Sequence, residues 1–164
     1  MAPRVEQLYQ EDFYAWTRDQ AAALRCLADE RWSGPLDLLN LAEEVEDLGR
    51  EQQWAVESQL ERIIEHLLKL EFSPSREPRR QCMISINSAR GEIERRLTPS
   101  VRREVEPSLP ALYRRARRNA NLALFDHGET EAARALPDAC PYAFDDLLAD
   151  EWWPASRHGL TDES

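Results

Sequence analysis

Apolar side chains recur along this chain at steps of three and four residues, the spacing that one face of an α-helix requires. The first such repeat consists of Phe13, Trp16, Gln20, Leu24 and Leu27. It predicts a helix from Asp12 to about residue 29. The Ser-Gly-Pro sequence at 33–35 then predicts a turn.

A second and longer repeat begins at Leu36 and continues in phase across Gly49. Its members are Leu38, Leu41, Val45, Leu48, Gln52, Val56, Leu60, Ile63, Leu67 and Leu70. Because a chain break would reset the phase, the pattern predicts one helix from Leu36 to about Glu71, on the order of 50 Å long. Gly49 is where a kink is expected.

Prolines divide the remaining chain into shorter predicted helices. One spans about 79–97, a short piece follows Pro99, and a fourth main helix begins after Ser108. A helical turn at 129–135 and a short final helix at 142–153 complete the pattern. No segment alternates with period two, so no sheet is expected. The sequence predicts an all-α, single-domain helical bundle of about four main helices over residues 1–154, and a disordered tail over 155–164.

Composition agrees with a globular domain of 164 residues, 42% apolar and 32% charged. Its apolar runs are far too short to span a bilayer, and acids and aromatics stand where a signal peptide would have basic and apolar residues. We therefore expect no membrane association and a cytoplasmic location. Cys26, Cys82 and Cys140 are odd in number and widely spaced, which predicts free, buried thiols.

The net charge of −10 is unevenly distributed. Residues 76–118 contain 12 arginines and 5 acids, whereas 1–75 contain 7 basic and 16 acidic residues. The run at 114–118 has the composition of a nucleic-acid surface, but the acidic flanks argue against this function. Interhelical pairing is the simpler explanation. It predicts carboxylates near several of Arg90, Arg102, Arg114 and Arg117.

The densest acidic cluster comprises Glu43, Glu44, Glu46 and Asp47. Three of these point away from the apolar face, and Glu44 lies at its edge. A divalent-metal site of a helical bundle needs carboxylates on facing helices, commonly with a Glu-x-x-His pair. The sequence contains no such pair and no known catalytic or zinc motif. We expect a solvated face that meets a partner, with no metal and no cofactor.

His66 lies at the edge of the same apolar face, in a column with Gln52 and Gln59. Each polar group there needs a hydrogen-bond partner. His66 is therefore expected to be largely buried, with a polar neighbour at one ring nitrogen. The alternative is a general base or ligand, since the imidazole pKa suits either role.

Two tryptophans are candidates for contact with a partner. Trp54 points away from the predicted core face, and exposed tryptophan is enriched in interface hot spots. Coverage by the C-terminal segment is the alternative. Trp16 belongs to the first helical repeat.

Four segments together resemble a known family. They are 12–16 (Asp-Phe-Tyr-Ala-Trp), 40–50 (Asn-Leu-Ala-Glu-Glu-Val-Glu-Asp-Leu-Gly-Arg), 66–69 (His-Leu-Leu-Lys) and 140–142 (Cys-Pro-Tyr). In this order they resemble the bacterial domain-of-unknown-function family twenty-nine, from about Leu8 to Pro154. The resemblance implies an all-α fold and supplies no activity and no functional residues. Leu38 and Leu70 stand where the family often has Trp, and Cys82 stands near another such position.

The leading functional hypothesis is a cytosolic protein–protein interaction or regulatory, antitoxin-like module. Its candidate surface comprises Asp12, Trp16, Glu43, Glu44, Glu46, Trp54 and His66. The alternatives are an enzyme or metal-dependent site around Glu43, Glu44 and His66, and a nucleic-acid-binding domain that uses the Arg-rich region 76–118.

Overall fold

The computed structural model describes residues 2–161, except the side chains of Ala2 and Pro3. Its helices are α1 (Ala2–Glu11), α2 (Phe13–Asp29), α3 (Leu38–Phe72), α4 (Arg79–Arg96), α5 (Pro99–Val105), a 3₁₀ turn (Glu106–Ser108), α6 (Leu109–Asp126), α7 (Thr130–Ala135) and α8 (Phe144–Leu148). No strand occurs within the described residues. The predicted all-α fold is confirmed, and so is the uninterrupted helix across Gly49.

The chain forms two compact units. Among the described residues, unit 1 consists of 2–55 with 96–105, and unit 2 of 56–95 with 106–161. The long helix α3 contributes its first half to unit 1 and its second half to unit 2.

Unit 1 is organised around Asp12, the residue before α2. Its Oδ1 accepts a hydrogen bond from the backbone N–H of Ala15 at 3.1 Å and caps α2, while its Oδ2 accepts one from Ser100 N at 3.0 Å. Burial alone would raise the pKa of Asp12, but hydrogen bonds from Ser100, Ala15 and Thr98 lower it below the usual value. Asp12 therefore joins the start of α2 to α5.

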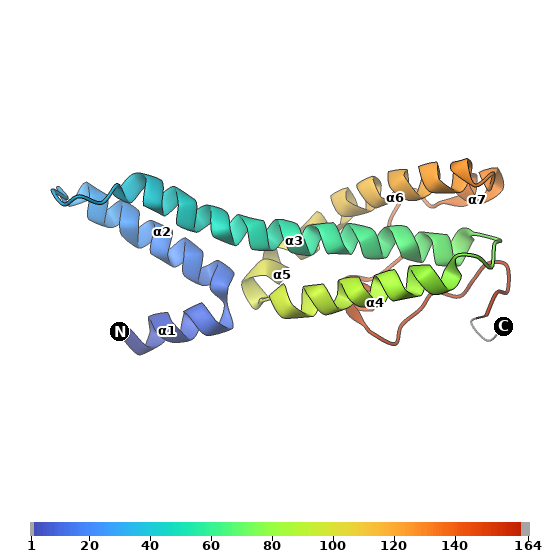
Figure 1. Ribbon diagram of the computed structural model, residues 1–164, viewed down its shortest axis with the longest axis horizontal. Coiled ribbons are helices and arrows are strands. Elements are labelled where there is room, and N and C mark those ends of the chain that lie inside the picture. The colour runs from blue at the N-terminus through green and yellow to red at the C-terminus, as the bar shows by residue number, and fades with distance from the viewer. Residues whose placement is uncertain (1, 162–164) are drawn as a thin grey trace. The chain divides into compact units, whose positions relative to one another are not determined.

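Small side chains make the closest part of the contact between α2 and α3, and the buried ring of Tyr14 packs beside them. Thr17 and Ala21 are buried on α2, and Ala42 is buried on α3. A Cβ atom on Gly49 would overlap the Thr17 hydroxyl. The glycine thus allows the two helices to approach closely, while the helix continues through it (Figure 1). In contrast, α1 was not predicted, because Val5, Leu8 and Tyr9 are too few to form a clear repeat.

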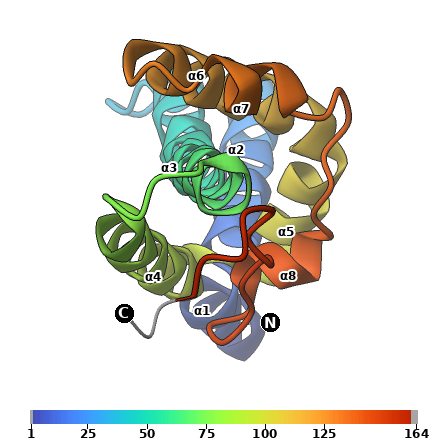
Figure 2. The same cartoon turned by 90° about the vertical axis from the view of Figure 1, so that its right-hand side faces the viewer.

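Unit 2 has its core along the second half of α3. The side chains of Val56, Leu60, Ile63, Ile64, Leu67 and Leu68 are fully buried. Viewed along α3, α6 lies on one side of it and α4 on another (Figure 2). The Tyr113 hydroxyl of α6 donates a hydrogen bond to the carbonyl of Pro137, and burial raises the Tyr113 pKa to about 12.

The C-terminal segment is mostly irregular. The helix predicted over 142–153 is restricted to α8. Arg90 of α4 donates to the carbonyl oxygens of Asp146 and Leu147, which the N–H groups of residues 150 and 151 would bind in a longer helix. Farther on, the backbone N–H of Arg157 donates to Glu71 O at 2.8 Å, and His158 Nε2 donates to Phe72 O at 3.0 Å. Both belong to the tail predicted to be disordered. Residues 162–164 of that tail lie outside the described residues.

Candidate interaction surface and cavity

In unit 1, α2 and α3 are antiparallel neighbours, and the two sides of this pair differ in character. Arg25 Nη2 of α2 and Glu46 Oε2 of α3 are 2.7 Å apart on one side. Each residue turns the helix by about 100°, so around the axis of α3 the directions of Leu41 and Leu48 differ by about 80–100° from that of Gly49. They lie on the side of Gly49 opposite to Glu46. By the same geometry, Leu27 lies on the side of α2 that faces away from Arg25. One side of the pair is ionic, and the other carries leucines.

These leucines are only partly covered. Leu27 is 38% exposed, Leu41 is 40% exposed and Leu48 is 48% exposed. The prediction that Leu41 and Leu48 belong to the core is therefore wrong. Because α2 and α3 meet closely at Thr17 and Gly49, Leu41 and Leu48 lie beside this contact, whereas the Tyr14 ring packs within it.

Helix α1 covers the beginning of this side. The ring of Tyr9 packs edge-on against Phe13 and Trp16, with centroid distances of 5.6 and 4.8 Å. Trp16 is half-buried there, and it also borders a shallow depression with Val5 and Tyr9. We call Trp16, Leu27, Leu41 and Leu48 the leucine face.

Acidic side chains accompany the leucine face. Glu6 borders the depression, and Glu44 and Glu51 lie on α3 beyond Leu41 and Leu48; all three are exposed. Glu43 is also exposed, but it points toward the opposite arc of α3. Glu46 belongs to the ionic side, where the hydrogen bond from Arg25 holds its pKa below the usual value.

Trp54 lies on α3 and is 58% exposed, as its helical phase predicts. It falls on a different arc of α3 from Leu41 and Leu48. Of the residues predicted to form one surface, Trp16 lies in the leucine face, Glu44 lies beside it, and Asp12 has a structural role. The interaction surface thus remains a prediction, now with Leu27, Leu41 and Leu48 at its centre.

His66 belongs to unit 2 and lies about six helical turns beyond Glu44 along α3. It is half-buried, and its Nδ1 is buried without a hydrogen-bond partner among the described residues. The predicted polar neighbour is therefore wrong; Gln52 Oε1 and Gln59 Oε1 in the same column are also unpaired within the described part of the chain. Burial, and then the charge of Lys69, lowers the His66 pKa.

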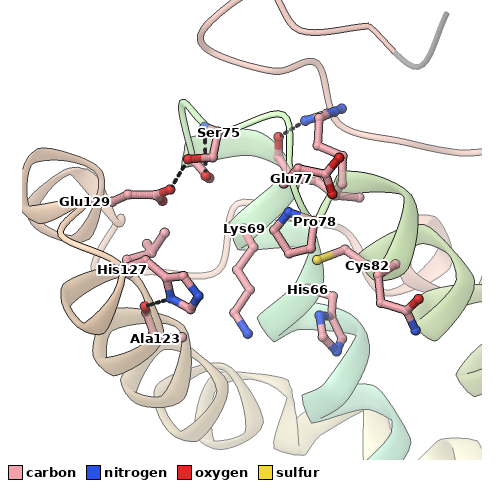
Figure 3. Close-up of a pocket in the computed structure, with 14 residues that line it drawn as sticks. His66, Lys69, Ser75, Glu77, Pro78, Cys82, Ala123, His127 and Glu129 are labelled. Carbon is pink, nitrogen blue, oxygen red and sulfur yellow. Dashed lines mark hydrogen bonds between the residues drawn. The ribbon is translucent and has the colours of Figure 1, made fainter. Parts of the chain in front are cut away.

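A cavity of about 220 Å³ lies beside His66 (Figure 3). His66 and Lys69 come from α3, Cys82 comes from α4, and His127 and Glu129 follow α6. Lys69 and His127 were not predicted to line a site. The one available signal was that Lys69 is the only lysine in a chain with 20 arginines.

The three cysteines differ in their surroundings. Burial raises the pKa of Cys82, so its thiol is protonated at neutral pH. Cys26 is exposed, which corrects the prediction that it is buried. Within residues 2–161, no three His, Cys, Asp or Glu side chains are grouped so that they could hold a metal ion.

The arginines of unit 2 are partly neutralised. Arg115 Nη2 lies 2.5 Å from Glu61 Oε1, and Arg117 Nη2 lies 3.3 Å from Asp138 Oδ1. For Arg90 the prediction of a carboxylate partner is wrong, because this side chain binds backbone carbonyls. The predicted pairing is thus found at Arg117, and at Arg115, which was not predicted to pair.

Within the described part of the chain, no helix combines the length and the apolar character needed to cross a bilayer.

Comparisons with known proteins identify the family. The family described as "Domain of unknown function DUF29" matches residues 8–153, so the chain belongs to it. A crystal structure of an α-helical protein of unknown function from Rhodospirillum rubrum is similar, with a TM-score of 0.78 and 26% identity over 88% of this chain and 90% of that one. No curated protein matches the sequence.

Proposed function

We propose that this member of the DUF29 family is a cytosolic protein-interaction module whose leucine face binds a basic amphipathic helix of a partner protein. The observation that carries the proposal is the exposure of Leu27, Leu41 and Leu48 on one side of the α2–α3 pair. Side chains of this kind, at helical spacing on two adjacent helices, form a surface that an amphipathic helix can cover.

Charge determines the chemistry of the partner. Residues 1–55 contain 5 basic and 12 acidic side chains. Glu6, Glu44 and Glu51 lie around the leucine face, whereas Arg25 lies on the other side of the α2–α3 pair. A helix with an apolar stripe and flanking Lys or Arg would complement this surface, and the charges would speed its association. An antitoxin-like regulator would bind a basic target in this way.

A synthetic peptide tests the proposal on the full chain. The probe is a fluorescent helix of about 18 residues with leucines at i, i+3, i+4 and i+7 and Lys or Arg elsewhere. A matched peptide carries Glu in place of each basic residue. Fluorescence anisotropy should show micromolar binding of the basic peptide that weakens with salt, and much weaker binding of the acidic one.

Two protein variants locate the binding site. The double variant Leu41→Gln, Leu48→Gln should weaken binding about tenfold, because two half-exposed leucines lose their coverage by the peptide. Leu122→Gln is the matched control, since Leu122 is 59% exposed on α6; it should bind like the wild type. The proposal would be overturned if the double variant and Leu122→Gln bound the basic peptide equally tightly. It would also be overturned if the wild type bound the basic and acidic peptides equally tightly. Self-association of the full chain that the double variant abolishes would overturn it as well, because the leucine face would then contact a second copy.

A further inference from the structure

The cavity beside His66 has an apolar body. Leu70, Pro78, Ala123 and Leu124 line it, and Leu70 and Leu124 are themselves buried. Its volume of about 220 Å³ exceeds that of the roughly 150 Å³ cavity known to take up benzene in another protein. The cavity therefore has room for a small aliphatic chain or an aromatic ring.

Nitrogen-bearing side chains gather at one part of this cavity. In Figure 3 the Lys69 side chain extends between the imidazole rings of His66 and His127. Lys69 Nζ binds Glu65 Oε1 at 2.6 Å through one of its three protons. His127 Nδ1 donates a hydrogen bond to the Ala123 carbonyl at 2.7 Å, so this bond does not involve Nε2, the other ring nitrogen. An ammonium and two imidazoles thus border the same space.

The carboxylates of the cavity lie elsewhere. Glu129 accepts a hydrogen bond from the Ser75 hydroxyl, and Figure 3 shows Glu129, Ser75 and Glu77 away from the His66 ring. The charged groups that act on His66 are Lys69, Glu65 and Arg62. An anion that entered beside Lys69 and His66 would meet the imidazole ring and the ammonium protons of Lys69 that are not bound to Glu65. Its apolar body would contact Pro78 and Leu124.

We infer that this cavity is a binding site for a small carboxylate with an apolar body, whose carboxylate group contacts Lys69 and His66. Carboxylate oxygens accept from ammonium and from imidazole N–H groups, and hydrogen bonds with a charged partner are stronger than neutral ones. A single negative charge suits the site better than two, because Glu77 and Glu129 also border the cavity.

Small molecules of matched shape test the inference on the full chain. The probes are hexanoate and benzoate, their neutral analogues hexanol and benzyl alcohol, and inorganic phosphate. Calorimetry should show that both carboxylates bind at least tenfold more tightly than the alcohols and phosphate. In an NMR titration, hexanoate should raise the pKa of the His66 imidazole, because the anion stabilises its protonated form.

Variants connect the binding to these residues. Lys69→Gln and His66→Gln should each weaken hexanoate binding about tenfold, which is the effect of losing one charge-assisted hydrogen bond. Ala123→Phe should abolish binding by filling the cavity from α6. Arg95→Gln, which removes an exposed cation of α4, is the matched control and should have no effect.

Thermal unfolding establishes that each variant is folded. If the Lys69→Gln protein does not fold, the variants Ala123→Phe and His66→Gln still test the inference. Equal affinity for alcohols and carboxylates would reduce the site to an apolar cavity and overturn the inference. Equal affinity for phosphate would make it a general anion site, with the same consequence. Absence of carboxylate binding at millimolar concentration, or wild-type affinity of the folded Lys69→Gln and His66→Gln proteins, would also overturn it.

Discussion

Arg90 Nε of α4 donates a hydrogen bond to the carbonyl oxygen of Leu147, 3.0 Å away and 57 residues later in the chain. The same guanidinium also donates to the carbonyls of Asp146, Asp150 and Trp152, and it lies 4.9 Å from the ring centroid of Trp153. Backbone dipoles and an aromatic face thus stabilise a buried charge. Burial lowers the Arg90 pKa, and the charge of Asp150 opposes this effect.

Replacement of Arg90 should therefore destabilise unit 2. Arg90→Leu leaves several carbonyl oxygens without their donor, and we expect a loss of about 3 kcal/mol in the free energy of unfolding. Arg95→Leu removes an arginine of the same helix whose side chain is 72% exposed, and it should change stability by less than about 0.5 kcal/mol. Urea denaturation measures both values. Similar stabilities of the two variants would show that the Arg90 contacts do not hold the C-terminal segment.

Two glycines in helices should respond in opposite directions to alanine. At Gly49 the new Cβ would overlap the Thr17 hydroxyl, so Gly49→Ala should destabilise the protein by about 1–3 kcal/mol. No atom lies within 4 Å of the corresponding position at Gly91. Gly91→Ala should therefore stabilise α4 by about 0.5–1 kcal/mol through helix propensity. Thermal unfolding checks both signs, and stabilisation by Gly49→Ala would contradict the close α2–α3 contact.

His66 should make stability depend on pH. Its pKa in the folded protein lies below the ordinary value of 6.5, so the unfolded chain binds the proton first as the pH falls. Stability should decrease below about pH 6.5 and stop decreasing once the pH reaches the folded-state pKa. His66→Gln should remove this part of the slope when Tm is measured between about pH 7.5 and 5.5. An unchanged slope in the variant would show that the imidazole titrates equally in both states.

His66→Leu tests the unpaired nitrogen directly. No described group bonds to the buried Nδ1, so leucine leaves no partner unsatisfied. We expect the stability at neutral pH to stay the same or to rise by about 1 kcal/mol. A loss of several kcal/mol in the urea midpoint analysis would mean that Nδ1 has a partner after all.

Nucleic acid should bind poorly. Glu61 pairs with Arg115 and Asp138 with Arg117, and these carboxylates reduce the positive potential of the Arg-rich region. At about 0.15 M salt, random-sequence RNA and DNA should bind with a Kd no tighter than about 10⁻⁴ M in an electrophoretic or anisotropy assay. Salt-sensitive micromolar binding would favour the nucleic-acid hypothesis instead.

The positions of helices could be predicted from the sequence where the signal lies within the helix itself. The apolar repeat of α3 continues through Gly49, and the prolines at 99 and 110 mark the starts of α5 and α6. Hydrophobic period and proline geometry act within a few residues, so they are evident in a single chain. In α1 the repeat is too short, and the helix was therefore missed.

Which apolar residues are buried depended on contacts between helices. The sequence shows that Leu41 and Leu48 share a face. In the structure, however, Ala42 and Gly49 are the buried residues, because small residues let α2 and α3 approach closely. Likewise, the sequence placed His66 at the edge of a helix face, and only the arrangement of α3, α4 and α6 placed Lys69, Cys82 and His127 around the same cavity. Helical periodicity determines the direction in which a side chain leaves its own helix. What the side chain contacts in that direction is determined by segments that lie far away in the sequence. The sequence by itself therefore determined the helices, and the tertiary structure decided the leucine face and the cavity.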